Sequence, residues 1–170
     1  FHISQEGQTA ASDINQDGAP LMLDDFQYMA RMIYDGHLPT PGPNFSGTIT
    51  TLPEMDDLRV ITDLKRPGGA MFLTFLVPDS GVVVTIGHDV AWDIRHSFSG
   101  DTLKIIVFDL AGQSIESGPQ EILKIYYGGP TPKLIDAIAA GFNGEGINLQ
   151  IKERVPFSIK IDSAKDIWPG

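Results

Sequence analysis

A short acidic loop that runs directly into an amphipathic helix is the feature that most constrains how this chain can fold. Residues 13 to 24, DINQDGAPLMLD, place oxygen-bearing side chains at positions 1, 3, 5 and 12 of the loop and a glycine at position 6. Calcium-binding loops need side-chain oxygens at these positions, a backbone carbonyl at position 7 and a glycine for the sharp turn. Several carboxylates in one short turn repel each other unless a cation neutralises them. The loop is therefore predicted to bind Ca²⁺.

The predicted ligands occupy positions 1, 3, 5, 7 and 12 of this loop. Leu21 stands at position 9 and has no side-chain oxygen, so water or another segment must complete the coordination shell. The alternative is a metal-free acidic turn that caps the following helix. The five predicted ligands are the side chains of Asp13, Asn15, Asp17 and Asp24 and the backbone carbonyl of Ala19.

The helix that follows is predicted from residue 23 to about residue 34. Its apolar residues recur at helical spacing, and Asp24 and Asp25 lie in the first turn, where carboxylates favour the helix dipole. Gly36 follows Asp35 as a stop signal. The residues at i, i+3, i+4 and i+7 are Phe26, Met29, Ala30 and Ile33.

The segment DINQDGAPLMLDDFQYMARMIYDG resembles one calcium-binding half of a dockerin, in which loops of the EF-hand type end with aspartate and the helix follows directly. Dockerins normally carry two such halves, which pack as a pair and dock on a cohesin. This sequence contains one recognisable half. The resemblance therefore implies that the second helix comes from elsewhere in the chain or from a partner.

The rest of the chain is predicted to be β-rich and joined to the helix by a linker. Residues 37 to 47 hold three of the twelve prolines and two glycines, which is typical of an extended linker. We divide the chain into an N-terminal arm, loop and helix (1–36), this linker (37–47) and a β-sandwich or jelly roll (48–170). The predicted strands are 46–51, 58–64, 70–77, 81–87, 102–110, 121–127, 147–152 and 157–162.

One stretch of the β-rich part is ambiguous, and two others carry a second resemblance. Residues 132–141 contain apolar residues that fit a helix turn, and their alanines weaken a strand assignment. The runs AMFLTFLVPDS (70–80) and GDTLKIIVFDLAGQSIESGPQEILKIYY (100–127) resemble the strand order of a divergent cohesin. The resemblance implies a noncatalytic sandwich that binds protein partners through a sheet face.

Composition narrows the classes of partner. The chain has a formal net charge of −10 and a pI near 4.6, so it repels nucleic acids and anionic membranes. The sequence contains no cysteine, so it has no disulfides or thiolate metal sites. In an exported protein, bound calcium would supply the stabilisation that disulfides otherwise give. No apolar run approaches the roughly 20 residues needed to cross a bilayer. The chain begins at Phe1, which we interpret as a processed form or a fragment.

Other chemistry is less strongly indicated. GHDVAWDIRH (87–96) contains two histidines and two aspartates, but without a recognised metal or acid-base spacing we interpret them as solvated loop residues. Trp92 is assigned to packing rather than to a sugar platform. Asn44 begins an N-x-S sequence and is a candidate glycan acceptor, where the host has the machinery. No hydrolase or nucleotide-binding signature is present in the sequence.

These features together predict an extracellular or cell-surface module that is not an enzyme. It would bind Ca²⁺ and a protein partner or other copies of itself, and self-assembly into a filament is the sharper version. The alternative is a calcium-dependent carbohydrate-binding module, which predicts exposed aromatic residues such as Trp92, Tyr126 or Trp168 on one sheet face.

Overall fold

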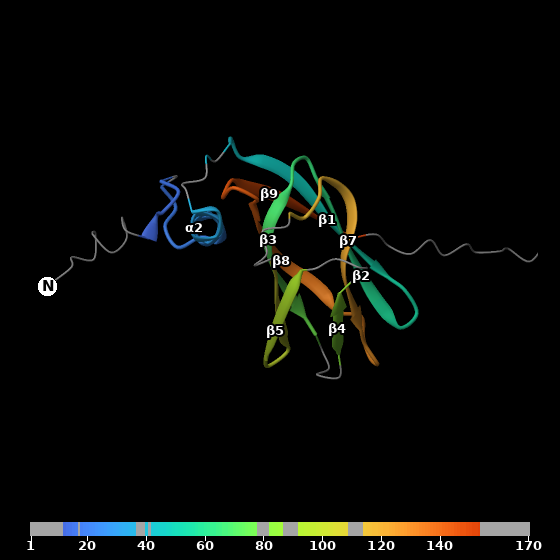
Figure 1. Ribbon diagram of the computed structural model, residues 1–170. Helices are drawn as coiled ribbons and strands as arrows, with labels where there is room; N and C mark the ends of the chain where they lie inside the picture. Colours follow the sequence, from blue (N-terminus) through green and yellow to red (C-terminus); the bar gives the residue numbers. More distant parts are fainter. Residues whose placement is uncertain are drawn as a thin grey trace, which may run out of the picture.

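One helix and nine strands make up the described part of the computed structural model (Figure 1). The structure describes residues 12–16, 18–36, 40, 42–77, 82–86, 92–108 and 114–153. Asp17 and the predicted strand 157–162 lie outside these residues. No described helix has the length and apolar character needed to cross a membrane. The elements are α2 (Leu23–Asp35), β1 (Phe45–Pro53), β2 (Asp57–Leu64), β3 (Gly68–Leu76), β4 (Val83–Ile86), β5 (Asp93–Ser99), β6 (Thr102–Phe108), β7 (Gly118–Tyr126), β8 (Lys133–Gly141) and β9 (Gly146–Glu153).

The strands form one curled sheet in the order β4-β7-β2-β1-β9-β8-β3-β6-β5. Its neighbouring strands run antiparallel except for β1 and β9, which are parallel. β9 follows β1 along its length but pairs with β8 only at Ile147 and Gly146. The sheet bends at this short pairing, so its two halves enclose one core (Figure 1).

Alternating side chains explain how that core is filled. Every second residue of β6 is fully buried, and the same alternation runs along β1 and β2. The buried side chains of β2 and β7 form a single cluster with those of β3 and β6, which lie in the other half of the sheet. The mainly β sandwich predicted from the sequence is therefore confirmed. Core residues with no exposed surface include Ile49, Val60, Leu73, Phe75, Leu103, Ile105 and Leu123.

All seven predicted strands that fall within the described residues are present, and two further strands were not predicted. The ambiguous stretch 132–141 is strand β8, because β3 pairs with it along most of its length and Leu134 and Ala139 fill the core. β5 occupies residues that we interpreted as a loop. β1 begins at Phe45, inside the stretch interpreted as linker, and Phe45 packs in the core.

Helix α2 lies against the end of β3 and β8 (Figure 1). Ala70 and Ala140 are paired with each other, point away from the core and still have no exposed surface. Because α2 is the helix that contacts these two strands, we infer that it covers this end of the sheet. The helix ends as predicted at Gly36, whose backbone is left-handed (φ 70°) and whose N–H bonds to the carbonyl of Met32.

Candidate functional site

Asp25 is the residue that shapes the acidic loop. Its carboxylate is almost completely buried and accepts hydrogen bonds from three backbone N–H groups. Oδ1 accepts from Ile14 at 2.7 Å and from Asn15 at 3.2 Å, while Oδ2 accepts from Met22 at 3.0 Å. The last bond is one half of a helix capping box, because Asp25 is the third residue of α2 and Met22 is its N-cap. One side chain thus ties the start of the loop to the start of the helix.

Four of the five predicted calcium ligands, all but Asp17, lie in the described residues, and Asp13 contacts a sharp turn. Asp13 Oδ2 accepts a hydrogen bond of 3.0 Å from the N–H of Gly18, and Gly18 has a φ of 90° that favours glycine. Asp24 lies in the first turn of α2 and is nearly buried, while Ala19 is exposed at the other side of the turn. In the described residues, which omit Asp17, no three His, Cys, Asp or Glu side chains converge to hold a metal. The structure therefore does not bring the described carboxylates together, and calcium binding by this loop stays a prediction.

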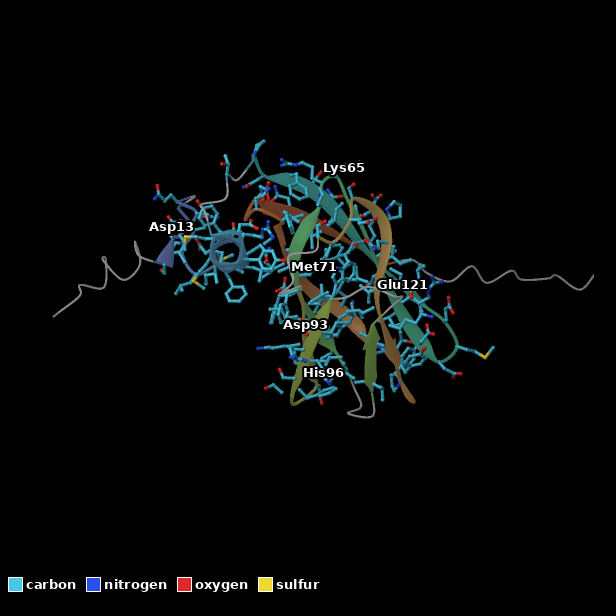
Figure 2. All side chains as sticks on the ribbon, in the orientation of Figure 1. Asp13, Lys65, Met71, Asp93, His96 and Glu121 are labelled. Carbon is cyan, nitrogen blue, oxygen red and sulfur yellow. The ribbon has the colours of Figure 1, made fainter. Side chains whose placement is uncertain are left out.

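The loop and helix attach to the sandwich through the turn between β8 and β9. Asn15 Nδ2 donates to the carbonyl of Gly144 at 3.3 Å, and Gln27 Nε2 donates to the carbonyl of Phe142 at 3.3 Å. The guanidinium of Arg31 lies 4.0 Å from the centre of the Phe142 ring, a cation–π arrangement. Figure 2 shows Asp13 beside α2, at the end of the molecule where this attachment lies.

Replacing Asp25 with alanine is expected to loosen the loop. Three part-buried N–H groups lose their acceptor, and the cost of leaving such donors unsatisfied is about 1–3 kcal/mol each. Hydrogen exchange at Ile14, Asn15 and Met22 should therefore accelerate. Asp25→Asn, which keeps one acceptor oxygen in its amide group, should have a smaller effect. Equal protection in Asp25→Ala and the unchanged chain would contradict this role.

The apolar side of α2 faces solvent rather than the sandwich. Asp24, Gln27 and Tyr28 are buried on the side that contacts the sheet. On the other side Phe26 is 46% exposed and Ile33 is 73% exposed. An amphipathic helix normally buries its apolar stripe, so α2 leaves exposed a surface that such helices usually cover. We call it the helix stripe; it consists of Met22, Phe26, Met29 and Ile33.

A second exposed apolar surface lies on the outside of β8, β3 and β6. Phe72 stands opposite Ile106 on β6 and opposite Ile138 on β8, and the core-facing neighbours of all three point the other way. Ile138 is 37% exposed. Leu76, which lies on the same side of β3 as Phe72, is 44% exposed. We call this surface the apolar sheet face; it consists of Phe72, Leu76, Ile106 and Ile138.

Charged residues frame the apolar sheet face. Arg95, Lys104 and Lys133 are exposed and point to the same side of the sheet as Asp93 and Asp136. Two of these cations have a carboxylate beside them, because Arg95 pairs with Asp93 at 3.7 Å and Lys133 pairs with Glu153 at 3.7 Å. In α2, Asp24 and Asp25 are buried and Asp35 pairs with Arg31 at 2.5 Å, so the aspartates of the helix give the helix stripe no acidic excess.

Within the described residues, the other candidates do not converge into a site. Asp93 and His96 lie three positions apart on β5, so their side chains point to opposite faces of the strand. His88 lies outside the described residues. Trp92 is 3% exposed and packs in the core, which confirms the packing interpretation and removes it as a sugar platform. Asn44 is exposed, and its Oδ1 accepts from the N–H of Gly146 at 3.0 Å.

Comparison with known proteins shows the fold. No family model matches the sequence, and no curated protein matches it. A structure titled as a type I cohesin–dockerin complex from Clostridium thermocellum contains a chain that matches with a TM-score of 0.50 and 9% identity, covering 66% of this chain and 93% of its own. A non-cellulosomal cohesin from Archaeoglobus fulgidus matches with a TM-score of 0.42 and 11% identity over 65% of this chain and 81% of its own.

A type II cohesin module from a scaffoldin of Acetivibrio cellulolyticus also matches, with a TM-score of 0.36 and 12% identity, covering 63% of this chain and 94% of its own. At such low identity these likenesses carry no residue roles, and the first of them carries the fold. The chain is mainly β, with a cohesin-like sandwich and one short helix before it.

Proposed function

We propose that this protein is a noncatalytic, extracellular assembly module whose copies join head to tail. In each contact the helix stripe of one copy lies on the apolar sheet face of the next copy. The observation that carries the proposal is that one chain bears two exposed apolar surfaces, and that the helix presents its apolar side outward. Bound Ca²⁺ would hold the loop that fixes the helix in this orientation.

The fold supports a protein partner rather than a small-molecule substrate. The matching structure with a TM-score of 0.50 is titled as a complex of a cohesin with a dockerin, so a sandwich of this shape is found with a protein partner in that case. The N-terminal segment resembles one dockerin half. A chain that combines a cohesin-like sandwich with a dockerin-like helix has both partners of such a contact in one molecule.

Shape also favours this pairing over two identical surfaces meeting. A helix is a convex ridge and a sheet face is broad, so the two bury more surface against each other than two ridges would. A contact between two different surfaces leaves one of each free in every assembled pair. Such contacts propagate into filaments unless they close into a ring.

Removing calcium is expected to weaken assembly by freeing the helix. The proposed ligands are Asp13, Asn15, Asp17, Ala19 and Asp24. With a chelator, the exchange of α2 amides should rise and the assembled fraction should fall, because binding to the folded loop is linked to its stability. Asp13→Ala should show the same behaviour without chelator and no further response to it. An unchanged melting temperature and an unchanged oligomeric state would remove calcium from the model.

Two charged substitutions test the head-to-tail contact. Phe26→Asp places a carboxylate on the helix stripe and Ile138→Asp places one on the sheet face, at side chains that are both partly exposed. Each variant alone should form smaller species in sedimentation than the unchanged chain does. Met55→Asp is the matched control, because Met55 is 95% exposed and lies on neither surface. It should assemble like the unchanged chain.

Mixing the two variants separates this arrangement from a symmetric one. Phe26→Asp retains an intact sheet face and Ile138→Asp retains an intact helix stripe, so an equimolar mixture should form larger species than either variant alone. A symmetric helix-to-helix contact would instead let Ile138→Asp alone assemble like the unchanged chain. If both single variants assembled normally, the head-to-tail contact would be wrong.

A further inference from the structure

Strand β5 ends the sheet with a long unpaired edge. All seven of its residues pair with β6, from Asp93 opposite Phe108 to Ser99 opposite Thr102. Within the described residues no strand pairs with its other side. Charged residues often protect such edges, but here they stand only at Asp93 and Arg95, in the first half of the strand. The second half carries no charged side chain, so its backbone can accept another strand.

The core is also left open along this edge. Ile94, His96 and Phe98 lie opposite the β6 residues that point into the core, so they belong to the inner side of the sheet. Their partners on β6 have no exposed surface, whereas Phe98 is 40% exposed and His96 is also exposed. His96 and Phe98 contact each other edge to face, with ring centres 6.0 Å apart. A further strand with an apolar inner side would cover this row.

The chain carries a segment of that pattern. Residues 157–162, FSIKID, alternate apolar and polar side chains in the way that predicts a strand with one buried face. Phe157, Ile159 and Ile161 would form its apolar side. The segment is six residues long, close to the seven of β5.

The segment 157–162 cannot reach the β5 edge of its own sandwich. The described chain ends with Glu153 at the end of β9, whose carboxylate lies 3.7 Å from Lys133 Nζ at the start of β8. Glu153 thus lies beside β8, and a strand beyond β5 would stand four spacings from β8 in the same half of the sheet, or about 19 Å. Four residue steps lead from Glu153 to Phe157, and they reach at most about 14 Å. The length of the connection therefore points to the β5 edge of another copy.

We propose that residues 157–162 of one copy add as a strand to the free edge of β5 in a neighbouring copy. The backbone of the donated strand completes the hydrogen bonds of the edge, and Phe157, Ile159 and Ile161 extend the inner row of Ile94, His96 and Phe98. Main-chain pairing of this kind supplies affinity, and the alternating side chains supply register. The contact uses the edge of the sheet, so it is separate from the contact between the helix stripe and the sheet face.

Cross-linking of the full-length chain tests the pairing directly, because the sequence contains no cysteine. One preparation carries Ser97→Cys, which lies on the outer side of β5, opposite Lys104. The second carries a cysteine at one polar position of the donated segment: Ser158→Cys, Lys160→Cys or Asp162→Cys. A short bis-maleimide should join the two preparations in at least one register, with a yield about tenfold above a control. The control is Ser46→Cys, an exposed position on the interior strand β1.

Further variants make the result decisive. In the Ser158→Cys chain, Ile159→Asp should abolish the cross-link because it places a charge on the apolar side. Lys160→Asp introduces the same charge on the polar side and should leave the cross-link in place. Ile138→Asp, which blocks the sheet-face contact, should also leave it in place, so the two proposals fail independently. No cross-link above the control in any register, or a cross-link within one chain that carries both cysteines, would overturn the proposal.

Discussion

Replacing Phe75 with alanine should lower the free energy of unfolding by about 3–5 kcal/mol, the usual cost of truncating a large buried aromatic residue. Phe75 has no exposed surface and stands on β3, opposite Leu103 on β6 and Leu134 on β8. Removing the ring leaves a cavity in the cluster that joins both halves of the sheet. Denaturant unfolding followed by circular dichroism should show a lower midpoint with an unchanged slope.

The control for this prediction is a truncation of similar chemistry at the surface. Met55→Ala removes an apolar side chain that is 95% exposed, so the midpoint should remain within about 0.5 kcal/mol of the unchanged chain. A loss of less than about 1 kcal/mol in Phe75→Ala would mean that the two halves of the sheet do not share one tightly packed core.

The strands that the sequence predicts are those whose burial alternates. In β6 the buried residues Leu103, Ile105 and Val107 occur at every second position, and the printed sequence shows this period directly. β8 breaks the pattern, because Ala140 is buried on the outer side by α2 and a register shift interrupts its pairing with β3. β5 is an edge strand that is mostly exposed, so it lacks the apolar alternation from which strands are predicted. Both depend on neighbours that are distant in sequence.

In the candidate site, too, some features follow from the local sequence and others depend on residues that are distant in sequence. The loop turn, the helix and its stop at Gly36 follow from local spacing. The role of Asp25 had a local signal, the third helix position of a capping box, but the N-cap is Met22, which has no oxygen to complete the motif. Helical periodicity identified the apolar stripe without showing which way it faces. That direction depends on hydrogen bonds to the turn at Phe142 and Gly144, more than 100 residues away.

Gly144→Ala should detach α2 and its loop from the sandwich while the sandwich stays folded. Gly144 has a φ of 84°, and a Cβ there would lie 2.7 Å from Tyr28 Cβ and 3.0 Å from the carbonyl oxygen of Asp24. Both are atoms of the helix that cannot move without shifting its backbone. Amides of α2 should lose at least about tenfold in hydrogen-exchange protection, which corresponds to about 1.4 kcal/mol. Strands β3 and β6 should keep theirs.

Gly118→Ala separates the steric effect from backbone strain. Gly118 has a φ of 89°, so alanine there carries nearly the same strain of about 1–2 kcal/mol, yet a Cβ would have no neighbour within 4 Å. This variant should keep the protection of α2 and should assemble normally. Gly144→Ala should also lose head-to-tail assembly, because the helix stripe binds a neighbour only while the polar side of α2 is fixed to the β8–β9 turn. If assembly survived the loss of α2 protection, the orientation of the helix would not be what makes its stripe available.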